Sequence, residues 1–382
     1  MKIVIAPNAL KGSLTAGEAA QALASGIRRA LPTADLVLLP VADGGDGFTE
    51  VLADALDAVP CHCSVRGPVG QSVNATFLYS ERSRTAVIEM AAAAGLILLD
   101  SKRLAPMTAN TRGVGELILA ALDRGAERII LGIGGSATVD GGTGMAQSLG
   151  ARFIDAHDRL VDPGGGSLIE IATIDFENLD PRIEKTEFQV VCDVNNPLLG
   201  DYGAARVFGP QKGATQQQVA ELEAGLEHFA SLLDTQLNID VRAIPGAGAA
   251  GGLGGGSLAF LGAELQPGAE LVLDLLDFDK VLNGADLVIT AEGQLDGQTA
   301  AGKAPAAVAG RARAAGIPCI AIAGSLGADT EDLADAGIDA AVSLCRGPVS
   351  LEYAMTNAAQ LMEATATQVI TTFCAGYKAA AG

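Results

Sequence analysis

The chain begins with two short apolar segments, KIVIAP at Lys2–Pro7 and DLVLLPVA at Asp35–Ala42. Apolar residues at helical spacing lie between them: Leu23, Ile27 and Leu31. Thr15 and Glu18 precede this stripe and are three residues apart, a spacing typical of a capping box at the start of a helix. The segment therefore predicts a strand, a helix and a second strand.

The same alternation returns near the C-terminus. Three short apolar segments alternate there with helical segments: DLVIT at Asp286–Thr290, PCIAIAG at Pro318–Gly324 and AAVSL at Ala340–Leu344. Wholly apolar strands that are separated by helices indicate a parallel sheet with both faces covered. The two ends of the chain are therefore predicted to share one doubly wound parallel-sheet domain.

The middle of the chain has a different pattern. CSVRGPVGQSVNATFLYS at Cys63–Ser80 and RTAVIEMA at Arg84–Ala91 read as strands joined by Gly and Ser turns, which predicts hairpins and a mixed sheet. We expect an α/β protein whose doubly wound domain is discontinuous, with residues 1–60 plus 278–382. An inserted mixed α/β domain is expected at residues 61–277.

Charge and hydropathy exclude several classes of protein. Among 382 residues, 45 acids and 25 bases give a net charge of −20, which opposes binding to nucleic acid or to anionic lipid. No apolar run reaches the ~20 residues that span a bilayer, and the first residues lack the pattern of a signal peptide. These features predict a cytoplasmic protein with no membrane or nucleic-acid partner.

Glycine is unusually frequent, with 48 of the 382 residues, and it is concentrated in a few segments. Four segments are rich in it: Asp43–Gly47, Gly132–Gly144, Gly164–Gly166 and Gly246–Gly256. Glycine lets backbone N–H groups approach a ligand closely or adopt positive φ, and phosphate-binding loops are the leading example. Flexible linkers and tight turns are the alternative. Two of the segments directly follow predicted strands, which favours ligand-binding loops.

The Gly132–Gly144 segment nearly matches a dinucleotide-binding fingerprint. Gly132, Gly134 and Ala137 have its spacing after a predicted strand, but the sequence leaves only a short helix from about Thr143. The match is therefore weak.

A second near-match, to the phosphate-binding P-loop, lies after the predicted strand at Asp286–Thr290. The GxxxxGK spacing runs from Gly297 to Lys303, but Ala304 stands where a P-loop carries Ser or Thr for Mg²⁺. Both near-matches indicate that glycine-rich loops at strand ends handle phosphate.

Carboxylates and lysines occupy the same turns. The acids that follow predicted strands are Asp43, Asp46, Asp140, Asp193, Glu292 and Asp296, and the loop lysines are Lys11, Lys212 and Lys303. Phosphoryl transfer from a nucleotide needs carboxylates for Mg²⁺, a carboxylate that accepts the proton of the attacking hydroxyl, and a cation beside the transferred group. Any one of these side chains is otherwise a helix cap or a solvated charge, but the whole set fits a phosphotransferase.

Six blocks, in this order along nearly the whole chain, resemble the bacterial glycerate kinase type-1 family. They are APNALKGSLTAGEAA, PVADGGDGFTEVL, LGIGGSATVDGGTGMAQSLGA, VVCDVNNPLLGDYGAARVFGPQKGA, IPGAGAAGGLGGG and ITAEGQLDGQTAAGKAP. The resemblance implies phosphorylation of D-glycerate with ATP and Mg²⁺, in a flavodoxin-like domain interrupted by a restriction-enzyme-like one. It implies 2-phosphoglycerate or 3-phosphoglycerate as the product, and we expect the 2-phosphate.

The residues and the resemblance together give each candidate side chain a role. Asp193 is expected to accept the hydroxyl proton, and Lys11 to balance charge in catalysis. The expected substrate-binding residues are Asp43, Gly44, Gly45, Arg112, Asp296 and Lys303. The expected nucleotide-phosphate residues are Gly134, Gly135, Ser136, Asp140 and Lys212. Glu292 and Asp296 are the expected Mg²⁺ ligands.

The first block departs from the family pattern, which usually carries Asp and Ser where this chain has Asn8 and Ala9. Lys11 is retained, but an acid and a hydroxyl are missing. Two other functions are weighed against the kinase: a nicotinamide-dependent oxidoreductase, from the Gly132 spacing, and a non-catalytic sensor of small acids, from the altered loop. A homodimer is also considered.

Overall fold

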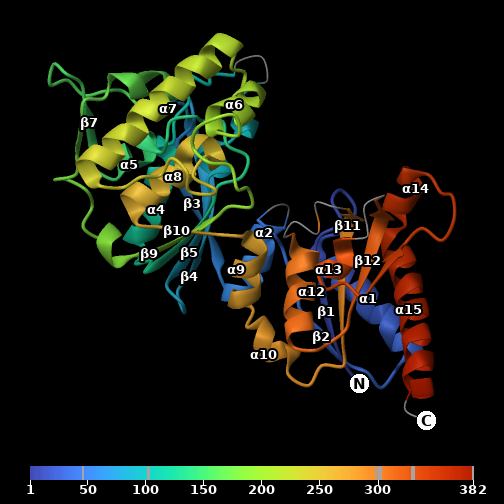
Figure 1. Cartoon of the computed structure of the whole chain (residues 1–382). Helices are drawn as coiled ribbons and strands as arrows, with labels where there is room; N and C mark the ends of the chain where they lie inside the picture. Colours follow the sequence, from blue (N-terminus) through green and yellow to red (C-terminus); the bar gives the residue numbers. More distant parts are fainter. Residues whose placement is uncertain (45–46, 101–103, 297–298, 300–302, 328–331, 381–382) are drawn as a thin grey trace. The chain divides into compact units, whose positions relative to one another are not determined.

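The computed structural model describes residues 1–44, 47–100, 104–296, 299, 303–327 and 332–380 (Figure 1). Contacts between residues divide the chain into two compact units. The first unit contains Met1–Val51 and Pro267–Gly382, and the second contains Leu52–Gln266. The domain boundaries expected from the sequence, at residues 60 and 278, remain a prediction. No helix in the described part of the chain combines the length and apolarity needed to span a membrane.

The first unit is built on a five-stranded sheet in which every pairing is parallel, as the apolar segments predict. Its strands, in spatial order, are β13 (Ala340–Ser343), β12 (Cys319–Leu326), β11 (Leu287–Leu295), β1 (Lys2–Pro7) and β2 (Asp35–Leu38). Counted along the chain within this unit, the order is 2-1-3-4-5. The two ends of the chain therefore meet at the β1–β11 pair, where Ile5 is in register with Ile289.

Helices cover both faces of this sheet, and Figure 1 shows α12 and α15 on opposite sides of it. Helices α1 (Ala16–Ala30) and α15 (Ala358–Ala380) pack together and share a core with Ile5 and Ile289. Helix α12 (Ala304–Ala314) contacts β1, β11 and β12. The shorter helices of the unit are α9 (Gly268–Leu275), α10 (Phe278–Leu282), α13 (Asp332–Asp335) and α14 (Leu351–Thr356), and α2 (Phe48–Leu56) leads into the second unit.

Helix α1 begins as the sequence predicts. Thr15 accepts a hydrogen bond from the Glu18 amide, and the Glu18 carboxylate accepts one from the Thr15 amide at 2.9 Å. The capping box is therefore confirmed.

The second unit is built on a six-stranded mixed sheet, which the sequence also predicts. Its strands, in spatial order, are β10 (Glu264–Gln266), β9 (Glu187–Val191), β6 (Arg128–Gly132), β5 (Thr85–Glu89), β4 (Ser72–Ser80) and β3 (Val59–Arg66). Strands β3, β4 and β5 form antiparallel hairpins, whereas β5, β6, β9 and β10 pair in parallel. A separate two-stranded sheet joins β7 (Arg152–Ile154) and β8 (Thr173–Asp175).

Helices and turns of the second unit pack around this sheet. The α-helices are α3 (Ala91–Ala94), α4 (Arg112–Asp123), α5 (Thr143–Ser148), α6 (Ala204–Phe208), α7 (Gln216–Leu237) and α8 (Ala249–Leu261). The 3₁₀ turns are η1 (Leu96–Leu98), η2 (Gly165–Glu170), η3 (Ile183–Lys185) and η4 (Pro210–Lys212). One buried face of α7, with Leu226 and Phe229 at its centre, fixes this helix to the core.

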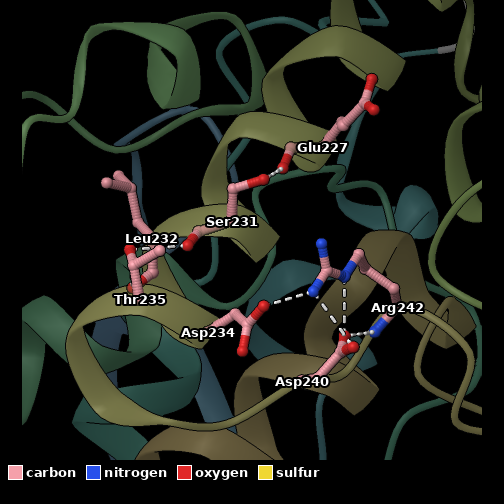
Figure 2. A network of polar contacts seen from close by, with 7 residues as sticks. All are labelled: Glu227, Ser231, Leu232, Asp234, Thr235, Asp240 and Arg242. Atoms are coloured by element: carbon pink, nitrogen blue, oxygen red, sulfur yellow. Dashed lines mark hydrogen bonds and ion pairs between the residues drawn. The ribbon is translucent and has the colours of Figure 1, made fainter.

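Arg242 fixes the segment that leads from α7 to α8 (Figure 2). Its guanidinium group bonds to the Asp240 carboxylate, with Nε 2.8 Å from Oδ1, and to Asp234 on α7. Within α7, the Ser231 and Thr235 hydroxyl groups donate to backbone carbonyls one turn earlier. The C-terminal end of α7 and the segment that follows it, up to Arg242, are therefore held together.

The glycine-rich segment Gly246–Gly256 differs from the expectation of a ligand-binding loop. From Ala249 onward it belongs to α8, which is buried and which is kinked at Ala250, Gly251 and Gly252, where φ is positive. A Cβ atom added at Gly251 would lie 2.0 Å from the Thr138 carbonyl oxygen, and one at Gly256 would lie 2.3 Å from the Gly141 carbonyl oxygen. These glycines let α8 pack directly against the backbone that follows β6, so packing within the protein itself requires glycine at both positions.

Candidate functional site

A pocket of about 870 Å³ lies at the carboxyl ends of the parallel strands of the first unit. Residues that follow β1, β2 and β13 line it together with the ends of β11 and β12; they include Asn8, Asp43, Glu292, Ser325 and Cys345. The carboxyl edge of a doubly wound sheet is where such proteins bind ligands, above all where the strand order reverses. Here that point lies between β1 and β11, next to Asn8 and Glu292.

Asn8 and Asp43 are joined across this edge. The Asn8 amide nitrogen Nδ2 donates to Asp43 Oδ2 at 3.1 Å, while Asn8 Oδ1 accepts from the Ala9 N–H at 2.8 Å. Asp43 also lies at the start of α12, with its Oδ2 3.5 Å from the Ala304 amide nitrogen. The positive end of the helix dipole favours a carboxylate there. Gly44 follows with φ of 89°, and Gly45 lies outside the described residues.

Lys11 projects from the tip of the loop after β1. The loop closes through hydrogen bonds from Leu10 N to Leu14 O and from Ser13 N to Leu10 O, both 2.8 Å. Gly12 has φ of 71°, and the Ser13 hydroxyl donates to the Met355 carbonyl at 3.0 Å. The exposed Lys11 side chain lines the pocket, as expected for a side chain that meets an anionic ligand.

Glu292 is the most strongly perturbed acid of the pocket. It is 9% exposed, and burial raises its pKa to about 7, although Lys303 at 3.8 Å and a hydrogen bond from Thr299 lower it. Lys303 lines the pocket from the N-cap of α12. Asp296 bonds to the Gln294 side chain at 3.0 Å and also contributes to the raised pKa of Glu292.

The carboxylates of the pocket fit a magnesium ion. Mg²⁺ is usually held by one or two protein carboxylates together with phosphate oxygens and water. Asp43 and Glu292 both line the pocket and supply two such groups beside two lysines. Within the described ranges, no three His, Cys, Asp or Glu side chains form a closed metal cluster. The donor set is therefore of the kind that needs a phosphate ligand to complete the coordination.

In the second unit, the loop after β6 exposes two glycines at its tip, Gly134 and Gly135. Gly135 has φ of 70°, and its carbonyl accepts a 2.9 Å hydrogen bond from the Leu96 N–H. A Cβ atom at Gly134 would meet nothing within 4 Å, so protein packing does not demand glycine there. Unlike Gly251 and Gly256, Gly134 is free for the close approach of a ligand.

Lys212 supports this loop from the interior. Its Nζ donates to Ser136 Oγ and to the Thr138 carbonyl, both at 2.7 Å. It is 1% exposed, and burial lowers its pKa to about 7, against the attraction of Asp140. Lys212 and Asp140 were expected to bind nucleotide phosphate, but the position of Lys212 suits a support of the loop better than a direct ligand contact.

Asp140 is completely buried and joins two loops. Its carboxylate accepts hydrogen bonds from the Thr111 amide and hydroxyl at 2.8 Å, and from the Gly142 and Gly144 amides at 3.2 Å. Burial raises its pKa, whereas these hydrogen bonds lower it. The next residue of the Thr111 turn, Arg112, is half-buried and donates to Gln147 at 3.1 Å. Asp140 therefore sets the position of Arg112.

Asp193 lies two residues beyond the end of β9 and is exposed. Because β9 pairs in parallel with β6, Asp193 and the Gly134–Ser136 loop follow the same edge of the sheet. The sequence predicts this arrangement, since both segments follow apolar strands. It gives no signal for Thr299, which contacts Glu292, or for Thr111, which contacts Asp140; burial alone identifies their importance.

Comparisons with known proteins cover the whole chain. A sequence model described as the glycerate kinase family matches residues 3–374. The glycerate kinase of Halalkalibacterium halodurans is 48% identical over 367 residues, which are 96% of this chain and 97% of that protein. The glycerate 2-kinase of Escherichia coli K12 is 47% identical over 358 residues, 94% of each protein.

The fold is also similar to a solved one. A crystal structure assigned to a glycerate kinase 2 of Salmonella typhimurium LT2 superposes with a TM-score of 0.89 over 99% of both chains, at 46% identity. The mixed α/β architecture is therefore shared with that structure.

Proposed function

The chain belongs to the glycerate kinase family, and from this premise we propose that it transfers the γ-phosphoryl group of ATP to a hydroxyl group of D-glycerate. It is thus a phosphotransferase with an alcohol as acceptor. The 47% identity with a glycerate 2-kinase supports 2-phosphoglycerate as the product, with 3-phosphoglycerate as the alternative. The observation that carries the proposal is the pocket that holds Lys11, Lys303, Asp43 and Glu292 at the strand ends.

We also propose a fold type for each of the two units. The first unit is a flavodoxin-like domain, and the second is an inserted restriction-enzyme-like domain with limits near residues 61 and 277. The strand order 2-1-3-4-5 of the first unit and its parallel pairing support the first assignment. The contiguous course of the second unit supports the insertion.

Each proposed role rests on the environment of one side chain. In the first unit, Asp43 and Glu292, with Asp296 beside Glu292, would hold Mg²⁺, which neutralises phosphate charge when bound. Lys11 and Lys303 attract phosphate oxygens. In the second unit, Asp193 accepts the proton as the glycerate oxygen bonds to the γ-phosphorus and the bond to the ADP oxygen breaks.

The remaining roles concern binding in the second unit. Arg112 is proposed to pair with the glycerate carboxylate, for which its planar guanidinium group is suited. The exposed Gly134 and Gly135 amides, supported through Ser136, are proposed to bind an anionic group. Gly44 is proposed to keep the substrate-binding role expected from the sequence, next to Asp43.

The oxidoreductase alternative loses its structural basis. In a dinucleotide-binding fold the helix begins within the glycine motif. Here α5 begins at Thr143, six residues after Ala137, so no helix begins within the Gly132 spacing.

An assay of ADP release tests the function. Purified protein with ATP, Mg²⁺ and D-glycerate is expected to release ADP, and ³¹P NMR of the product distinguishes the 2-phosphate from the 3-phosphate. Binding of glycerate without ADP release would instead favour a sensor. A cytoplasmic location and a homodimer are proposed with the function, and light scattering of the purified protein tests the dimer.

A further inference from the structure

The lining of the pocket in the first unit contains two chemically different groups of side chains. The polar and charged group includes Asn8, Lys11, Asp43, Glu292 and Lys303. A second, apolar group is formed by Leu344, Val349, Leu351, Ala354 and Met355. We call the second group the apolar wall. A ligand that fills the whole pocket must itself have an anionic part and an apolar part.

Glycerate does not meet this requirement. It is a three-carbon acid with polar groups on every carbon, whereas the pocket of about 870 Å³ is of the size that encloses a drug-sized ligand. Burial of its hydroxyl groups against apolar side chains would leave them without hydrogen-bond partners, which is costly. The dimensions and the chemistry therefore fit a larger molecule.

Three side chains of the apolar wall are solvent-exposed to an unusual degree for large hydrophobic residues. Val349 is 45% exposed, Leu351 is 75% exposed and Met355 is 37% exposed. Apolar groups that line a pocket beside convergent charges are typical of sites for small organic ligands. Contact with a flat aromatic base would remove this surface from water, which is favourable.

The apolar wall and the charged group are tied together. The Ser13 hydroxyl donates to the Met355 carbonyl at 3.0 Å, which joins the loop that carries Lys11 to helix α14. The Ser350 side chain caps the same helix by accepting from the Tyr353 amide at 3.2 Å. A ligand that touches both groups therefore meets positions that are already organised.

We infer that the first unit holds the nucleotide, with its base on the apolar wall and its phosphates directed to Lys11 and Lys303. The inference rests on the proposed function, which makes ATP the phosphoryl donor. It differs from the expectation that Asp140 and Lys212 bind nucleotide phosphate, and both of those side chains are buried with protein partners.

Photolabelling with 8-azido-ATP and Mg²⁺, without glycerate, places the base directly. We expect saturable labelling within residues 344–358, prevented by ATP. Labelling of residues 132–144 or 246–256 in the second unit, or an absence of saturable labelling, would overturn the inference. The azide group is on the base, so the labelled residues show whether the base lies on the apolar wall.

A pair of variants on one helix gives a second measurement. Leu351 lines the pocket, and Tyr353, which is 51% exposed on the same helix, does not belong to its lining. Leu351→Asp is expected to raise the Kd for Mg²⁺–ATP at least tenfold by calorimetry, with Tyr353→Asp within twofold of the wild type. Equal affinities of the two variants would contradict the inference. Unchanged thermal unfolding of both variants excludes misfolding as the cause.

The two proposals can fail separately. If ATP labels the apolar wall but no glycerate is phosphorylated, the proposed function falls and the nucleotide site stands. If glycerate is phosphorylated while the label lies in the second unit, the function stands and the inferred site falls.

Discussion

Lys212 Nζ lies 2.7 Å from Ser136 Oγ in the interior of the second unit. The lysine also donates to the Thr138 carbonyl, so two hydrogen bonds fix the backbone that continues from the exposed Gly134–Gly135 tip. The sequence suggests that Lys212 binds an anionic ligand directly, whereas in the structure its side chain supports the backbone of this loop from the interior. Its burial makes the stability of this unit sensitive to pH.

The buried Lys212 gives a prediction for alkaline pH. Its pKa is 10.5 in the unfolded chain and about 7 in the folded protein, so the unfolded chain binds more protons between these values. Stability at this position is therefore expected to rise with pH in that window. The unfolding free energy of the wild type minus that of Lys212→Met should increase from about pH 7 to about pH 10, by at most about 1.4 kcal/mol per pH unit. Urea titrations measure this difference, and parallel pH curves would refute the prediction.

For Glu292 the expected pH dependence of the stability has the opposite sign, and it lies at lower pH. Its pKa is 4.5 in the unfolded chain and about 7 in the folded protein, which therefore binds more protons in this window. Stability at this position is lost as pH rises through it. Without Mg²⁺, Glu292→Gln is expected to gain stability relative to the wild type from about pH 5 to about pH 8. Thermal unfolding measures this gain, with the exposed Glu352→Gln as control, and a gain in both variants would refute the assignment to Glu292.

Asp193→Asn tests the proposed base. A positioned general base contributes about 10²- to 10⁴-fold to the rate, so turnover should fall by that factor. Because Asp193 is exposed, the melting temperature should stay that of the wild type. Steady-state ADP release and thermal unfolding give the two readouts. Near-normal turnover would remove Asp193 as the base.

Asn8→Asp tests the magnesium assignment. The substitution places a second carboxylate at hydrogen-bond distance from Asp43, where Asn8 now donates at 3.1 Å, and the two charges repel each other. The variant should unfold at a lower temperature than the wild type without Mg²⁺, and should gain more than the wild type when Mg²⁺ is added. Asn8→Ala, which adds no charge, is the control. The same Mg²⁺ response in all three proteins would argue against a metal at this position.

Two helical glycines are expected to respond in opposite ways to alanine. At Gly256 the added Cβ would lie 2.3 Å from the Gly141 carbonyl oxygen, so Gly256→Ala should destabilise the protein by about 3 kcal/mol or more. At Gly310 on α12 nothing lies within 4 Å, so Gly310→Ala should stabilise it by up to about 1 kcal/mol. Chemical denaturation compares the unfolding free energies of the two variants with that of the wild type. An unchanged unfolding free energy in Gly256→Ala would show that α8 can move away from the loop.

Local sequence patterns predict the strands and the charged group of the pocket well. Residues 3–6 of β1 and 287–289 of β11 are all apolar because both faces of a parallel sheet are covered, and that pattern is visible in the sequence. Lys11, Asp43 and Glu292 could be placed together because parallel strands bring their carboxyl ends to one edge.

The features that the sequence does not predict depend on contacts between distant segments. Helix α8 looks like a loop because its glycines serve close packing with the backbone near Thr138, more than a hundred residues earlier. The burial of Lys212 depends on the same assembly of segments. The apolar wall arises from Val349 and Leu351, which have no pattern that separates them from core residues.

The pairing of Ile5 with Ile289 has a consequence for biosynthesis. Strand β1 is synthesised before the second unit, yet its neighbour β11 becomes available only after the whole second unit has been made. The contiguous second unit can therefore fold during translation, as domains generally do, before β1 can pair with β11. Closure of the first sheet is then a late step that requires long-range contacts, and such steps are intrinsically slow. Until β11 emerges, β1 lacks one of its two neighbouring strands.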